Sequence, residues 1–133
     1  MSITYERSGG FVGKYEKLAF DPEFKSVTAS ERGQACPPRI LSPAESAQLR
    51  VWYEKLKGEQ APQDPGTARH VSDAFQVSLS LEGGPSFSTS TLGFPVGGLG
   101  AFDPLLAWLD QALTDELRRH NPGRPVILSP EEI

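Results

Sequence analysis

The stretch AFQVSLSLE, residues 74–82, decides how this 133-residue chain folds. Its apolar residues alternate with polar ones, a pattern typical of a strand with one buried face and one wet face. Residues 83–85 (GGP) then turn the chain, and residues 86–92 (SFSTSTL) return beside it. A three-residue loop at 83–85 would place Phe87 opposite Leu81 on the apolar face, so we expect this register.

A second hairpin is expected at the start of the chain. In residues 2–8, Ile3 and Tyr5 alternate with polar residues, and residues 14–20 (KYEKLAF) read as the returning strand. The segments 25–41 and 58–72 are polar or rich in proline and glycine, and we predict a mobile loop for each.

Two helices complete the pattern. Ser42, with proline next to it and Glu45 three residues later, forms a capping box that predicts a helix over 43–57. Asp103, also followed by proline, predicts the start of a second helix with a broad face of leucines.

The element order β-β-α-β-β-α predicts an α+β fold, in which a four-stranded antiparallel sheet carries two helices packed on one face. A chain of this length can bury a core without disulfides. We expect a single domain over residues 1–122, followed by a C-terminal tail over 123–133.

Composition excludes several classes of function. Thirteen basic against seventeen acidic residues give a net charge of −4, which argues against binding to nucleic acid. The sequence has neither a signal peptide at its start nor an apolar run of membrane-spanning length, so we predict a soluble cytoplasmic protein with no membrane partner. Cys36 is the only cysteine, which excludes an internal disulfide and a thiolate zinc cluster. The oligomeric state is left open.

The usual signatures of catalysis and of cofactor binding are missing. His70 and His120 are far apart and form no pair at metal-ligand spacing. Residues 97–100 (GGLG) precede a helix, but no Gly-Lys-Ser/Thr follows, and Asp103 at the helix N-cap would repel a phosphate. We therefore expect no metal, no cofactor and no enzymatic activity. A further hypothesis is that the protein is a small enzyme, and a deep pocket lined by titratable residues would favour it.

The connection of the first hairpin is the most unusual segment. Its three glycines are entropically costly unless the backbone needs a positive φ or a close approach. Phe11, between them, either folds back onto the core of a bulged hairpin or is presented to a partner as an apolar anchor. The candidate partner-binding residues are Arg7, Ser8, Gly9, Gly10, Phe11, Val12 and Gly13.

Three segments resemble the emfourin family, protein inhibitors of protealysin. Residues 3–13 (ITYERSGGFVG) resemble the N-terminal signature of the family. Residues 73–81 (DAFQVSLSL) are similar to one of its strands, with Val77 where an aromatic residue is usual, and residues 104–109 (PLLAWL) are similar to its closing helix. The resemblance covers residues 1–24 and 71–117, and leaves the longer middle segment outside it.

This resemblance implies an inhibitor of thermolysin-like zinc metalloproteases that blocks the active-site cleft of its target. On this hypothesis Phe11 enters an apolar pocket of the protease and Arg7 pairs with an acidic rim. The loops at 83–85 and 93–101 are candidate second contacts. The alternative is a noncatalytic interaction module whose partner is a different protein.

Overall fold

The computed structural model describes residues 2–9, 14–62, 75–91 and 98–120 of the chain. Its elements follow one another as β1 (Ile3–Gly9), β2 (Lys14–Phe20), β3 (Ser26–Glu31), β4 (Gln34–Ala35), β5 (Arg39–Ile40), α1 (Pro43–Leu56), β6 (Phe75–Leu81), β7 (Ser86–Thr91), a 3-10 turn η1 (Gly100–Phe102) and α2 (Asp103–His120). The α+β class and the two predicted helices are confirmed.

The antiparallel sheet is larger than predicted. Its strands lie in the order β4-β3-β2-β1-β6-β7, and the short β5 also pairs with β3. The two expected hairpins are present, joined edge to edge through β1 and β6. The prediction of four strands was wrong, because residues 25–41, expected to be a mobile loop, contribute three more in the described chain.

Local turns explain why this segment pairs with the sheet. The Asp21 carboxylate accepts the backbone N–H of Ser26 at 2.7 Å, which closes the turn between β2 and β3 and places Phe24 in the core with a φ of 55°. Arg32 and Gly33 both have positive φ, as a two-residue hairpin turn requires, and they join β3 to β4. Consecutive prolines then interrupt the outer strand.

The hairpin of β6 and β7 has the predicted face but a different register. Phe87 lies opposite Leu79, two residues from the expected position opposite Leu81. The loop between the paired residues Leu81 and Pro85 is still three residues long, and Gly83 takes the positive φ that its turn requires. A shift of two residues keeps every side chain on its expected face, so the buried pattern alone could not fix the register.

Capping determines where the helices begin. In α1 the Ser42 hydroxyl accepts the N–H of Glu45, and the Glu45 carboxylate accepts the N–H of Ser42, as predicted. Asp103 is the first residue of α2 rather than a residue ahead of it, because η1 extends the helical conformation backwards. Its carboxylate accepts the N–H of Leu99 at 2.9 Å.

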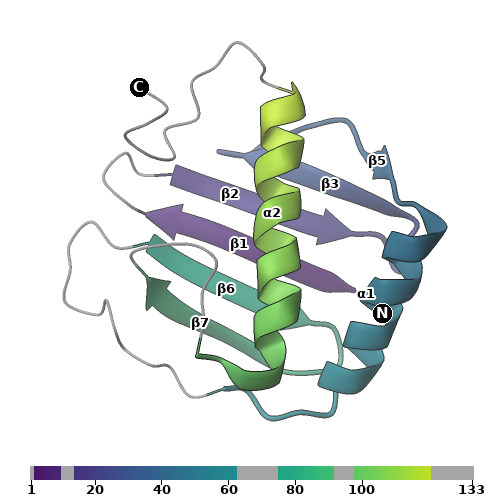
Figure 1. Ribbon diagram of the computed structural model, residues 1–133. Helices are drawn as coiled ribbons and strands as arrows, with labels where there is room; N and C mark the ends of the chain where they lie inside the picture. Colours follow the sequence, from purple (N-terminus) through teal and green to yellow (C-terminus); the bar gives the residue numbers. More distant parts are fainter. Residues whose placement is uncertain (1, 10–13, 63–74, 92–97, 121–133) are drawn as a thin grey trace.

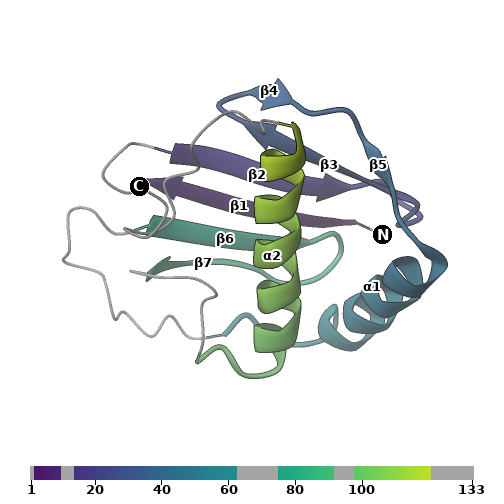
Figure 2. The same cartoon turned by 45° about the horizontal axis from the view of Figure 1, so that its top comes forward.

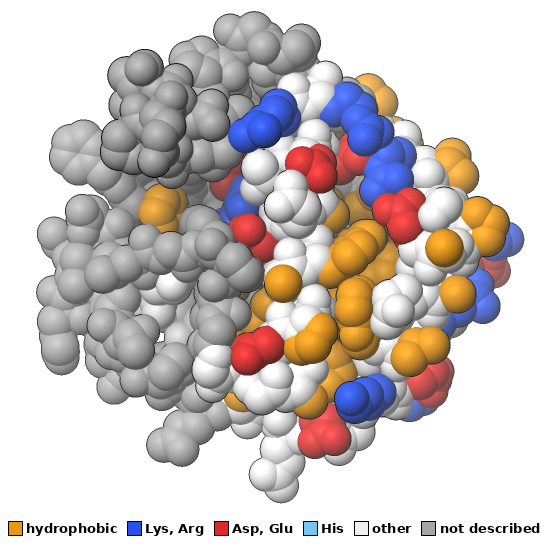
Figure 3. All heavy atoms as spheres, in the orientation of Figure 1, with side chains coloured by type: hydrophobic (Ala, Val, Ile, Leu, Met, Phe, Trp, Pro, Cys, Tyr) orange, Lys and Arg blue, Asp and Glu red, His pale blue; other side chains and the backbone are white. Residues whose placement is uncertain are grey.

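The helices and the sheet form two layers. In Figures 1 and 2, α2 runs across the strands, and α1 lies beside the end of the sheet where β1 begins. Figure 3 shows hydrophobic side chains gathered between the two helices, where Trp52 of α1 and Trp108 of α2 have ring centroids 6.3 Å apart. The opposite face of the sheet carries no helix of the described residues. No described helix has the length and hydropathy needed to cross a membrane.

Candidate functional site

The predicted partner-binding segment begins inside the sheet. Arg7, Ser8 and Gly9 are the last residues of β1, and the pairing with β2 continues up to Gly9 and Lys14. The other predicted residues, Gly10, Phe11, Val12 and Gly13, lie outside the described residues. The described structure therefore gives the base of this hairpin loop.

Arg7 occupies a buried ion cluster under α2. One guanidinium nitrogen lies 3.0 Å from the Glu16 carboxylate, and another lies 2.6 Å from the Asp110 carboxylate and 3.1 Å from the Thr114 hydroxyl. The Arg7 and Glu16 side chains are each only 4% exposed. The expectation that Arg7 pairs with an acidic rim of a partner does not fit this position, because its charge is neutralised inside the chain.

The cluster joins three elements at the base of the loop. Glu16 belongs to β2, and Asp110 and Thr114 belong to α2, so Arg7 of β1 links the hairpin to the helix above it. Tyr5 adds to this cluster, since its hydroxyl lies 3.5 Å from the Asp110 carboxylate. Burial, together with the nearby Asp110 charge, raises the pKa of Tyr5 well above its ordinary value, so the phenol stays protonated.

The next residue, Ser8, lies on the open side of the sheet, because side chains alternate along β1 and Arg7 faces α2. Ser8 lies opposite Tyr15 of β2, whose side chain is 43% exposed. Gly9 has a φ of 89°, in the region that favours glycine, where β1 enters the loop. Arg32 of the β3–β4 turn donates its N–H to the Tyr15 carbonyl at 2.8 Å. The Arg32-Gly33 turn therefore lies beside the base of the loop.

The loop at 83–85 lies at the other end of the sheet. Glu82 donates its N–H to the carbonyl of Ser2, at the start of β1. The loop base, at Gly9 and Lys14, is at the end of β1. The expectation that residues 83–85 form a second contact beside the first loop is therefore not supported by this placement. Of the other expected contact, 93–101, only residues 98–101 are described.

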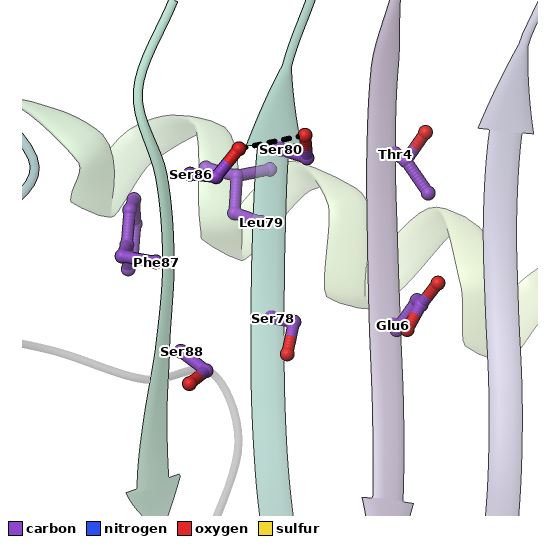
Figure 4. A pocket seen from close by; sticks show the side chains of 8 residues that line it. All are labelled: Thr4, Glu6, Ser78, Leu79, Ser80, Ser86, Phe87 and Ser88. Carbon is purple, nitrogen blue, oxygen red and sulfur yellow. Dashed lines mark hydrogen bonds between the residues drawn. The ribbon is translucent and has the colours of Figure 1, made fainter.

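A shallow hollow of about 380 Å³ lies on the open face. Figure 4 shows that side chains of β1, β6 and β7 line it, most of them serine or threonine. The hydroxyl groups of Ser80 and Ser86 are joined by a hydrogen bond of 2.8 Å. Its lining residues are Thr4, Glu6, Ser78, Leu79, Ser80, Ser86, Phe87 and Ser88. Five of these eight residues carry a hydroxyl group, and only Glu6 among them is charged.

A smaller hollow of about 210 Å³ lies between α1 and the second half of α2. Arg39 donates two hydrogen bonds to Glu45, of 3.0 and 3.1 Å, and a further one to the buried Glu116. Arg119 lies 3.4 Å from the same Glu116 carboxylate. The hydrogen bonds from Arg39 lower the pKa of Glu45, and this network links β5 to both helices.

Groups that could bind a metal do not cluster in the described part of the chain. No three His, Cys, Asp or Glu side chains there are grouped to hold an ion. His70 and the side chain of His120 lie outside that part. Cys36 is half-buried, and burial raises the pKa of its thiol, with the Glu116 charge contributing to a smaller extent.

The residues missed by sequence reasoning are the partners of Arg7. Glu16 lies directly opposite Arg7 in the first hairpin, whereas Asp110 is 103 positions away in the sequence. One signal was present, because Ile3, Tyr5 and Arg7 share one side of an alternating strand. That alternation alone predicts an inward-facing arginine, which requires acidic partners.

Comparison with known proteins adds no relative: no protein-family model matches the chain, and neither a curated protein nor a solved structure matches it significantly. The resemblance of residues 3–13 to the emfourin signature therefore stays a prediction.

Proposed function

We propose that this protein inhibits thermolysin-like zinc metalloproteases by inserting the β1–β2 loop into the active-site cleft. The observation that supports the proposal most is the construction of the loop base. Both strands remain paired up to Gly9 and Lys14, and the Arg7–Glu16–Asp110 cluster fixes them to α2. A rigid base lowers the entropy lost when a loop binds, and so favours affinity.

The loop alone is too small to supply a tight complex. Burial of the Phe11 side chain in a pocket would contribute about 1.5–3 kcal/mol. A stable interface needs roughly 800 Å² on each partner. The Arg32-Gly33 turn and the exposed ring of Tyr15 lie beside the loop base, and we expect them to supply the neighbouring contacts.

The experiment is a titration of a thermolysin-like protease with the purified protein. The remaining protease activity is measured from the hydrolysis of a quenched fluorescent peptide. The proposal predicts a stoichiometric loss of activity while the inhibitor remains uncut. Phe11→Ala should weaken inhibition by at least roughly tenfold, or about 1.4 kcal/mol. The matched control is Val51→Ala, which removes an exposed apolar side chain from α1 and should inhibit like the wild type.

Two results would overturn the proposal. The first is full protease activity at micromolar inhibitor with several thermolysin-like enzymes, which would favour an interaction module with another partner. The second is a Phe11→Ala variant that melts at a lower temperature and still inhibits fully. Phe11 would then belong to the core rather than to the contact surface.

A further inference from the structure

The two edges of the described sheet differ in how they end. At one edge β3 pairs with β4 and β5, which have two residues each and are separated by Pro37 and Pro38. At the other edge β7 runs unbroken for six residues, Ser86–Thr91. Short strands and prolines protect a sheet edge against pairing with another chain. The β7 edge is a strand of six residues that contains no proline, so it lacks both kinds of protection.

The outward-facing backbone groups of β7 follow from its pairing with β6. The Leu81 N–H donates to the Pro85 carbonyl, so these two residues form a hydrogen-bonded pair. Such pairs alternate along an antiparallel ladder. The amide and carbonyl groups of Ser86, Ser88 and Ser90 therefore point away from β6. No backbone hydrogen bond from another described segment reaches these three residues.

The side chains of β7 also favour pairing. The strand contains no charged residue and no proline, the two features that most often block an edge. On the open face its serines lie opposite Ser80 and Ser78 of β6, and the Ser80 and Ser86 hydroxyls are hydrogen-bonded. Figure 4 shows this row of serines along β6 and β7.

We propose that the β7 edge pairs with the β7 edge of a second copy of this chain, so that two sheets become continuous across a two-fold axis. With Ser88 facing its own counterpart, Ser86 lies opposite Ser90 of the other copy, and all three outward residues form hydrogen-bonded pairs. On the open face every pair across the axis is serine on serine. This continues the pattern already present between β6 and β7, and it brings no like charges together.

The spacing of the outward-facing serines favours a second copy of this chain as the partner of the edge. The outward residues read Ser-x-Ser-x-Ser in either direction, so the edge is complementary to itself in antiparallel pairing. A contact of two six-residue strands is smaller than a standard interface, and we expect a dimer that dissociates on dilution. The proposal is independent of the protease-inhibitor function.

The first experiment combines sedimentation with amide hydrogen exchange on the whole chain over a wide range of concentration. The proposal predicts a shift from monomer to dimer as concentration rises. The same shift should protect the amides of Ser86, Ser88 and Ser90. Protection of Phe87 and Thr89 should not depend on concentration, since their amides already face β6. A chain that stays monomeric throughout, or dimerises without this alternation, would overturn the proposal.

Charge substitutions at the axis give the second experiment. Ser88→Lys and Ser88→Glu each place like charges opposite one another and should each be monomeric, whereas an equal mixture of the two should form a heterodimer. The control is Thr28→Lys, on the same open face but in β3, which should dimerise like the wild type. Dimers of Ser88→Lys alone, or loss of dimers in Thr28→Lys, would contradict pairing through β7.

Discussion

The two halves of α2 pack against the sheet in different ways. In residues 103–109 the buried side chains are Leu105, Leu106 and Leu109, all apolar. In residues 110–120 the buried leucines are interspersed with polar residues. Asp110 and Thr114 accept hydrogen bonds from Arg7, and Glu116 accepts one from Arg39. The first half gains its stability from burial, and the second gains much of its geometry from directed ion pairs.

This difference suggests that the first half of α2 mainly stabilises the fold, whereas the second half mainly sets the position of the helix on the sheet. Apolar contacts are non-directional, so the first half of α2 tolerates small shifts of the helix along the sheet. Ion pairs require a particular geometry, and their net contribution to stability is small because both charges lose water. The ion pairs of Arg7 lie at the base of the β1–β2 loop, and we infer that they fix this base.

Arg7→Met should have the largest effect. The substitution leaves Glu16 and Asp110 without their buried counter-charge, and breaking such a pair costs about 3–5 kcal/mol. Urea unfolding measures this loss. Adding Glu16→Gln should recover part of it, because one uncompensated charge is removed. If Arg7→Met alone lowers the free energy of unfolding by less than Arg7→Met combined with Glu16→Gln, the cluster is not a coupled unit.

Leu106→Ala tests the apolar half of the helix. Leu106 is completely buried, and truncation of such a side chain costs about 2–5 kcal/mol. The loss should be the same at low and high salt, since no charge is involved. A strong dependence of this loss on salt, in the same unfolding experiment, would contradict the division of α2 into two halves.

The smallest effect concerns pH and the Arg39–Glu45–Glu116 network. Hydrogen bonds from Arg39 hold the pKa of Glu45 below its ordinary value of 4.5. Glu45 therefore stabilises the fold fully above pH 4.5, and this contribution is lost as the pH falls through the lower folded-state pKa. Glu45→Gln should be less stable at neutral pH and should lose less stability on acidification. Parallel stability profiles for variant and wild type between pH 2 and 7 would refute this.

The sequence predicted the elements that carry strong periodic patterns. Residues 74–82 alternate clearly, and the Ser42–Glu45 capping box marks where α1 begins, so these elements could be read directly. β3 was missed because Val27 and Ala29 are its only buried apolar residues. β4 and β5 contain two residues each, too few for any period to be visible.

The candidate site was predictable only in part. The glycine-rich connection was visible in the sequence, and the positive φ of Gly9 agrees with the expected need for glycine there. The ion cluster at the base of the loop was not visible, because Arg7 and Asp110 are separated by 103 positions. Pairing between such distant charges depends on how the helix crosses the sheet, which no local pattern encodes.

If the ion cluster positions the β1–β2 loop for a protease, as we propose, its loss should weaken inhibition. The most direct measurement compares the inhibition of one thermolysin-like protease by wild type, Arg7→Met and Leu106→Ala, under conditions in which all three are folded. We predict that Leu106→Ala inhibits like the wild type, although it is destabilised, and that Arg7→Met inhibits at least roughly tenfold more weakly. Equal inhibition by all three, or no inhibition by the wild type, would contradict the account.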